Sequence, residues 1–69
     1  MKTKIFKQDS YKYLSVNDNI VCAFNETKNQ FIRCTTVNIT EKVIDAINDF
    51  RNIYNLEKIT LKMFMEEFI

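Results

Sequence analysis

Few side chains in this 69-residue chain could take part in covalent or acid–base chemistry. There is no histidine, so the most common general base and a common neutral metal ligand are both missing. Cys22 and Cys34 are too few for a structural zinc site, which takes four ligands. The chain also lacks glycine, which the loops that cradle phosphates require. We therefore expect no enzymatic activity, no metal and no cofactor.

Carboxylates recur at four-residue spacing in the second half of the chain, where they would line one face of a helix. Like charges at this spacing destabilise an isolated helix by roughly 0.2–0.5 kcal/mol per pair. A basic surface on a protein partner would offset that cost. A plain solvated face, diluted by Lys42 and Arg51, is the alternative interpretation. The predicted partner-binding residues are Glu41, Asp45 and Asp49.

Lysines alternate with apolar and aromatic residues near the N-terminus, and a strand would place Lys2 and Lys4 on one face. Lysines contact phosphates and aromatic rings stack on unpaired bases, so such a ribbon could bind nucleic acid. An edge strand whose lysines deter aggregation is the simpler interpretation, and a pI near 7.7 favours it. The residues of this alternative nucleic-acid site are Lys2, Lys4, Lys7, Tyr11, Lys12, Tyr13 and Arg33.

The net charge of +1 conceals an asymmetry between the two halves of the chain. Residues 1–37 carry six basic and three acidic side chains, whereas residues 38–69 carry four basic and six acidic ones. The halves therefore have net charges of +3 and −2. We expect a weak dipole, in which a partner meets one half or the other.

Short, roughly alternating segments rich in Ile, Val, Phe, Tyr and Thr predict strands before residue 38. The predicted strands are residues 4–7, 11–16, 20–24 and 31–37. Without glycine, asparagine must supply left-handed turn conformations, most of all Asn19, Asn25 and Asn29.

The third and fourth predicted strands should form a hairpin that pairs Phe24 with Ile32 and Cys22 with Cys34. A shift by one residue would place Arg33 opposite Cys22 on the buried side, so we reject it. Because no secretion signal is present, we expect the two cysteines to be free thiols that behave as small buried hydrophobic residues.

Two helices are predicted after residue 38, at residues 41–54 and 61–68, each preceded by an Ile-Thr pair. Thr40 and Thr60 are the predicted N-caps. The second helix has apolar residues on more than one side, so it either packs into a groove of its own sheet or docks against a second copy. The predicted dimer contacts are Leu61, Met65 and Phe68.

These elements predict one α+β domain over residues 1–69, with an antiparallel sheet of three to four strands in residues 1–37. Residues 38–69 form the helical half, with two helices packed on the sheet. No apolar run is long enough for a signal peptide or a membrane span, so the chain is expected to be complete and cytoplasmic.

The segment 31–50, a strand that runs through Asn38-Ile39-Thr40-Glu41 into an amphipathic helix, carries a resemblance to known proteins. In this order of elements, in size and in richness of lysine, asparagine and isoleucine, the chain resembles small phage- or plasmid-encoded proteins, including some anti-CRISPR inhibitors. The resemblance implies a short accessory protein that occupies the surface of a host effector, in the cytoplasm of the host cell if the protein is virus-encoded. It implies no particular functional residue.

Two functions follow from these observations. The first is a non-enzymatic protein-binding module that inhibits or modulates a host effector. The alternative is a small nucleic-acid-binding regulator, because a strand followed by two helices also suggests a ribbon-helix-helix dimer, with Arg33 and Thr35 facing the bases. The additional strand segments in residues 1–24, which that fold does not need, and the acids of the first helix favour the protein-binding function.

Overall fold

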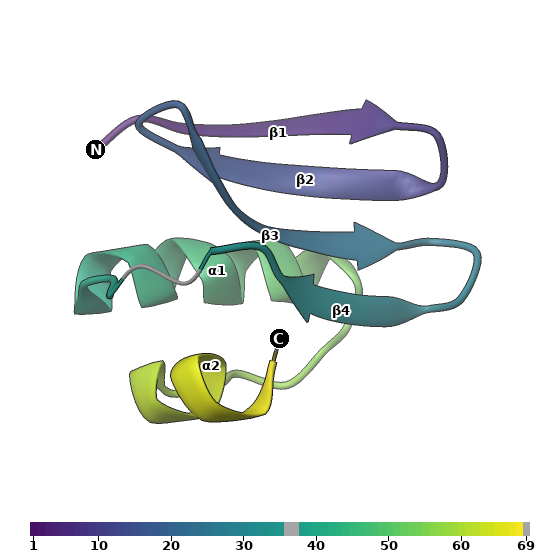
Figure 1. Ribbon diagram of the computed structural model, residues 1–69. Helices are drawn as coiled ribbons and strands as arrows, with labels where there is room; N and C mark the ends of the chain where they lie inside the picture. The colour runs from purple at the N-terminus through teal and green to yellow at the C-terminus, as the bar shows by residue number, and fades with distance from the viewer. Residues whose placement is uncertain (36–37, 69) are drawn as a thin grey trace.

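The segments rich in β-branched and aromatic residues form four strands that are neighbours both in the chain and in space (Figure 1). The computed structural model describes residues 1–35 and 38–68. Its elements are β1 (Thr3–Gln8), β2 (Tyr11–Val16), β3 (Asn19–Asn25), β4 (Gln30–Arg33), α1 (Glu41–Ile53) and α2 (Leu61–Glu67). All adjacent strands are antiparallel, in the order β1-β2-β3-β4. The predicted α+β architecture, a sheet followed by two helices, is confirmed.

Asparagine and aspartate make the turns in this glycine-free chain. The described residues with positive φ are Asp9, Asn17, Asp18, Asn29 and Asn55. Asn17 and Asp18, with φ of 50° and 67°, form the two-residue loop between β2 and β3. Positive φ at both loop positions matches the right-handed twist of the flanking strands.

The predicted left-handed position at Asn29 is confirmed, whereas the predictions for Asn19 and Asn25 are wrong. Asn19 is the first residue of β3, because the turn is completed one residue earlier. Asn25 ends β3 and stabilises the next loop with its side chain instead. Its Oδ1 accepts hydrogen bonds from the backbone N–H groups of Thr27 (3.0 Å) and Lys28 (3.1 Å).

Both predicted helix caps are confirmed. The Thr40 side chain accepts a hydrogen bond from the N–H of Val43 (3.4 Å), and that of Thr60 accepts one from Met63 (3.1 Å). Each bond satisfies one of the backbone donors that a helix start leaves unpaired. Both helices end one residue before the prediction, at Ile53 and Glu67.

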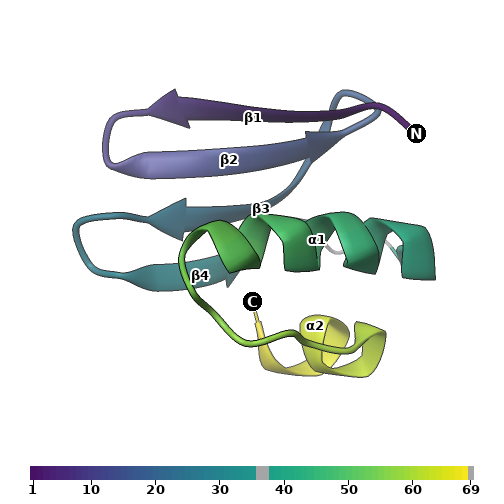
Figure 2. The same ribbon diagram turned by 180° about the vertical axis from the view of Figure 1, so that it is seen from behind.

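Figure 2 shows α1 lying across one face of the sheet with α2 beside it. The core fills the space between the helices and the sheet. Phe24 of β3 stacks on Tyr54 with ring centroids 4.1 Å apart, and Phe50 and Phe64 are fully buried. The buried hydrophobic residues are Leu14, Val16, Val21, Cys22, Ala23, Phe24, Ile44, Ile47, Phe50, Ile59 and Phe64.

Arg51 is a charged residue inside this packing, with 7% of its surface exposed. Its guanidinium carbon lies 4.6 Å from the ring centroid of Phe31 and 5.3 Å from that of Phe68. Its Nε donates to the carbonyl oxygen of Glu57 (2.8 Å). Cation–π contacts and a hydrogen bond thus compensate for the burial of the charge and join α1, β4 and the C-terminal end of α2.

The predicted register of the last hairpin is wrong by one residue. Cys22 pairs with Arg33 and Phe24 with Phe31, which is the arrangement rejected above. Arg33 tolerates this position because its guanidinium donates to the carbonyl oxygens of Met65 (2.7 Å) and Phe64 (3.4 Å) at the end of α2. The unpaired carbonyls of a helix C-terminus attract a cation, so the arginine has a partner on the buried side.

The fourth strand is shorter than predicted, since β4 ends at Arg33 and residues 36–37 lie outside the described residues. Both cysteines are free, as predicted. Cys22 is buried, but Cys34 lies beyond the end of β4 and is exposed, so the prediction that it is buried is wrong. No helix in the described part of the chain has the length and apolar character to cross a membrane.

Candidate functional site

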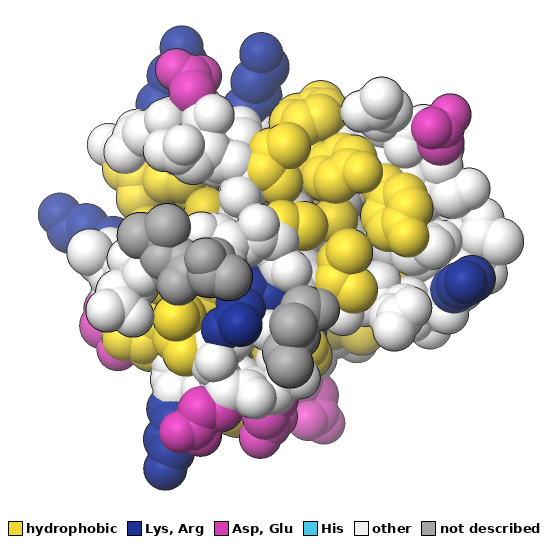
Figure 3. Space-filling view, in the orientation of Figure 1, with side chains coloured by type: hydrophobic (Ala, Val, Ile, Leu, Met, Phe, Trp, Pro, Cys, Tyr) yellow, Lys and Arg dark blue, Asp and Glu magenta, His cyan; other side chains and the backbone are white. Residues whose placement is uncertain are grey.

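The sheet has two very different faces. Along each strand, alternate side chains point to opposite faces, so those that do not meet α1 lie on the other side of the sheet. We call this side the outer face. Within the described residues neither helix covers it, as Figures 1 and 2 show from front and back. The space-filling view in Figure 3 looks onto this face and shows apolar side chains gathered over the strands.

The register places one apolar residue from every strand in a single row across the outer face. Phe6 pairs with Tyr13, Tyr13 with Ala23, and Ala23 with Ile32. We call these four residues the outer row. Phe6, Tyr13 and Ile32 are each half-buried, and Ala23 is fully covered. The row is therefore a continuous apolar strip across the whole sheet, with three large side chains that solvent still reaches.

Polar residues flank the outer row on one side. Gln8 pairs with Tyr11, Tyr11 with Asn25, and Asn25 with Gln30, which forms a second row across the same face. On the other side of the outer row, Lys4 pairs with Ser15 and Ser15 with Ile20, which is 40% exposed. An apolar centre with a mostly polar border has the composition of a protein–protein contact patch.

The aromatic rings of the outer face stack on one another. The ring centroids of Phe6 and Tyr13 are 5.2 Å apart with planes inclined by 23°, and those of Tyr11 and Tyr13 are 5.9 Å apart at 25°. Part of each ring face is therefore already covered by its neighbour. Beside them, a shallow hollow of about 470 Å³ is lined by Lys4, Phe6, Ser15, Asp18 and Ile20.

The structure separates the residues of the predicted nucleic-acid site. Tyr11, Tyr13 and Lys4 share the outer face, but Lys7 and Lys12 pair with each other on the side that faces α1. Lys7 forms an ion pair with Glu26, with Nζ and Oε1 3.2 Å apart.

A further cation of that predicted site is held by the fold, because the guanidinium of Arg33 binds the end of α2. Lys2 is exposed, and its backbone N–H donates to Asn17 Oδ1 (3.0 Å) in the β2–β3 turn.

The predicted partner-binding carboxylates lie on α1, on the other side of the sheet from the outer row. Glu41, Asp45 and Asp49 are all exposed, and no ion pair joins any of them to another described residue. Asp45 and Asp49 border a shallow hollow of about 340 Å³ between α1 and the start of β1. The three acids and the outer row cannot contact one flat partner surface together.

Most of the apolar side chains of α2 pack against other parts of the same chain. Leu61, Met65 and Phe68 are half-buried and pack against the core. Phe68 meets the edge of the Phe31 ring, with centroids 5.1 Å apart. The helix thus packs into its own sheet, which is one of the two arrangements expected from its sequence; the dimer contact through these residues stays a prediction.

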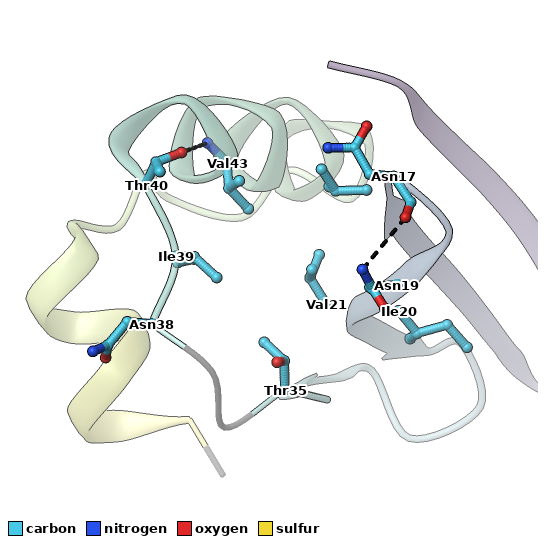
Figure 4. Close-up of a pocket in the computed structure, with 10 residues that line it drawn as sticks. Asn17, Asn19, Ile20, Val21, Thr35, Asn38, Ile39, Thr40 and Val43 are labelled. Atoms are coloured by element: carbon cyan, nitrogen blue, oxygen red, sulfur yellow. Dashed lines mark hydrogen bonds between the residues drawn. The ribbon is translucent and has the colours of Figure 1, made fainter.

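A separate cavity of about 400 Å³ opens at the end of the sheet, between the β2–β3 turn and the segment that leads into α1 (Figure 4). Ile20, Val21, Ile39 and Val43 contribute apolar walls, and asparagine and threonine side chains supply the polar groups. No charged or thiol side chain lines it among the described residues. Its chemistry is limited to apolar contact and neutral hydrogen bonds.

Three large residues of the outer face, Phe6, Ile20 and Ile32, were not among the predicted site residues. The signal that could have found them is the surplus of apolar residues on both faces of the predicted strands, given that two helices can cover only one face. Tyr11 and Tyr13 were among the predicted site residues, but the role predicted for them was stacking on nucleic-acid bases.

Neither cysteine thiol has a lowered pKa. Burial raises the pKa of the Cys22 thiol well above its usual range, and the proximity of Cys34 raises it further. Burial also raises the pKa of Cys34. Since the thiolate is the nucleophile and the metal ligand, raised pKa values keep both side chains mainly in the unreactive protonated form near neutral pH. No group of three or more metal-binding side chains occurs in the described ranges.

Comparison with protein-family models, with curated proteins and with solved structures finds no match to this chain. A function for this chain is therefore inferred from its fold and its outer face.

Proposed function

We propose that this chain is a non-enzymatic protein-binding module whose contact surface is the outer face of the sheet. One observation carries the proposal: the outer row runs across all four strands without a charged residue, and no helix in the described part of the chain lies over it. Aromatic residues such as Phe6 and Tyr13 are enriched where proteins meet, because they bury much apolar surface at little cost in side-chain entropy.

The same face is poorly suited to nucleic acid. Binding to unpaired bases takes exposed ring faces beside a positively charged groove. Here the rings stack on one another, and three of the five predicted cations, Lys7, Lys12 and Arg33, lie on the other side of the sheet. The geometry thus favours protein binding over the nucleic-acid alternative.

The partner we propose is a different protein with a mainly apolar contact surface. Four strands of about six residues cover roughly 20 Å by 20 Å, or about 400 Å². A stable interface buries about 800 Å² on each partner. Two copies that met face to face would each bury only about 400 Å², which is half of what a stable interface buries. The partner must therefore extend its contact beyond the outer face onto the borders of that face.

Binding of this kind acts by occupying a surface of the partner. The resemblance to small phage- and plasmid-encoded inhibitors implies the same mode of action on a host effector. Support for it here is the open apolar face, together with thiols whose pKa values are raised rather than lowered.

Site-specific photocrosslinking tests the proposal. Benzoylphenylalanine is placed at Tyr13 in the outer row and, as a matched control, at Asn52 on the exposed side of α1. In lysate of the natural host cell, we expect a discrete protein adduct from position 13 that is absent from position 52. Because a charge in the outer row has to be desolvated on binding, Ile32→Asp should remove this adduct.

Three results would contradict the proposal. Equal adducts from both positions would indicate non-specific contact, and adducts with nucleic acid alone would favour the alternative function. An adduct that survives Ile32→Asp would place the contact elsewhere. A gel-shift at low salt, where electrostatic binding to phosphates is strongest, checks the nucleic-acid alternative directly, and we expect no complex.

A further inference from the structure

The first strand is the most exposed structural element next to the outer face. Five of its six residues are exposed, and only Phe6 is half-buried. All six pair with β2 in unbroken register, without a bulge or a proline. In the described part of the chain no strand lies beyond it. The opposite edge strand, β4, has four residues and is joined to α2 by Arg33.

The hydrogen bonds at the start of β1 determine which backbone groups face outward. Asn17 N–H donates to the carbonyl oxygen of Lys2 (2.8 Å), and Lys2 N–H donates to Asn17 Oδ1 (3.0 Å). In an antiparallel pair, residues that bond to the neighbouring strand alternate with residues that do not. Lys4, Phe6 and Gln8 therefore bond to β2. The backbone N–H and C=O groups of Thr3, Ile5 and Lys7 point away from the sheet.

The charged side chains of this edge strand are all basic. Residues 1–8 include Lys2, Lys4 and Lys7 and no acid, and of these Lys7 is paired with Glu26 of the loop after β3. Two copies joined along β1 would bring six lysines together without a counter-charge from either strand. An extended segment that carries acidic residues would instead place opposite charges side by side across the strands, which stabilises cross-strand pairs.

We propose that β1 accepts an extended acidic segment of the partner as a fifth strand of the sheet. Strand addition satisfies the outward N–H and C=O groups of Thr3, Ile5 and Lys7, and side chains of the partner read the flanking lysines. The inference rests on the proposed function in requiring a protein partner. It also shows how that partner extends its contact beyond the outer face, since the added strand continues the face next to Phe6.

Amide hydrogen exchange of the full-length chain, followed by NMR, tests the proposal. The probe is a capped eight-residue peptide that alternates glutamate and valine. At a peptide concentration of ten times Kd, exchange at Thr3, Ile5 and Lys7 should slow about tenfold, whereas Lys4, Phe6 and Gln8, already bonded to β2, should change little. This alternation is specific to pairing at an edge, because binding on a face would not distinguish neighbouring amides.

Two controls separate backbone pairing from charge attraction. The same peptide with an N-methyl group on every residue keeps its charge but has no backbone donor, and we expect it not to slow exchange. In the chain, Ile5→Pro removes one outward donor while leaving the β2 ladder intact, since proline is tolerated at an edge where its nitrogen faces solvent. It should abolish the effect; if this variant does not fold, the methylated peptide still decides.

Several outcomes would overturn the inference. Equal slowing by a lysine-valine peptide would exclude selection by charge, and equal slowing of all six amides would exclude edge pairing. Slowing that appears without peptide and grows with protein concentration would assign the edge to a second copy. The proposed function is tested separately. If position 13 gives no adduct while the alternating exchange pattern in β1 is present, the outer-face proposal is contradicted and strand addition at β1 is not.

Discussion

Replacing Arg33 with methionine tests the contact that holds α2 against the sheet. The guanidinium donates to two backbone carbonyls of α2, at 2.7 Å and 3.4 Å. A hydrogen bond from a charged donor contributes about 1.5–3 kcal/mol, and its loss leaves the helix end without a cation. Because α2 has seven residues and a helix this short is marginal in isolation, we expect it to depend on the contact.

The expected loss is a large share of the total stability. At roughly 0.05–0.15 kcal/mol per residue, a chain of this length has about 3–10 kcal/mol of unfolding free energy. We expect Arg33→Met to lower it by about 2 kcal/mol, which at a urea m-value of about 1 kcal/mol/M moves the midpoint by about 2 M.

Urea unfolding followed by circular dichroism measures this change. Lys62→Met, an exposed substitution within α2, is the matched control and should change the unfolding free energy by less than about 0.5 kcal/mol. Both contacts come from a single guanidinium nitrogen, Nη1. Arg33→Lys should lie between the two, because lysine keeps a charged donor but its ammonium is more strongly hydrated and sits on a flexible stem. A loss below about 0.5 kcal/mol for Arg33→Met would refute the reasoning and, with it, our physical explanation of the hairpin register.

Two further predictions concern a buried thiol and the acids of α1. Burial raises the pKa of Cys22 above its ordinary value near 9, so the folded state keeps a proton that the unfolded chain releases. The unfolding free energy should therefore fall above pH 9, by up to about 1.4 kcal/mol per pH unit, and urea unfolding of Cys22→Ala should show a shallower slope; equal slopes would contradict this. Asp45→Lys with Asp49→Lys should leave the position-13 adduct unchanged, and its loss would favour the acidic surface predicted from the sequence.

The elements could be predicted because local chemistry determines them. Alternating apolar residues marked the strands, and Thr40 and Thr60 marked the starts of both helices to the residue. Turn positions were less predictable. Any of several asparagines can adopt positive φ, and only the pairing of β2 with β3 shows that Asn17 and Asp18, not Asn19, form the loop.

The hairpin register could not be predicted because its cause lies more than thirty residues away. Pattern alone favours pairing Cys22 with Cys34, since burying an arginine without a partner is costly. The partner of Arg33 is the C-terminal end of α2, and no local pattern shows that this helix end lies beside β4. The predicted nucleic-acid set is divided for a different, local reason: Lys12 and Tyr13 are adjacent in a strand, so their side chains point to opposite faces.

This register also decides what the outer face is made of. In the pairing predicted from the sequence, Ile32 would face the core, and Arg33 would lie among the outer-face residues. In the observed pairing Arg33 points to α2, and Ile32 completes the outer row beside Ala23. One arginine contact therefore both fixes α2 and keeps charge off the apolar strip. If α2 detaches in Arg33→Met, the contact that stabilises the observed hairpin register is lost. We then expect the yield of the position-13 adduct and the unfolding free energy to fall together.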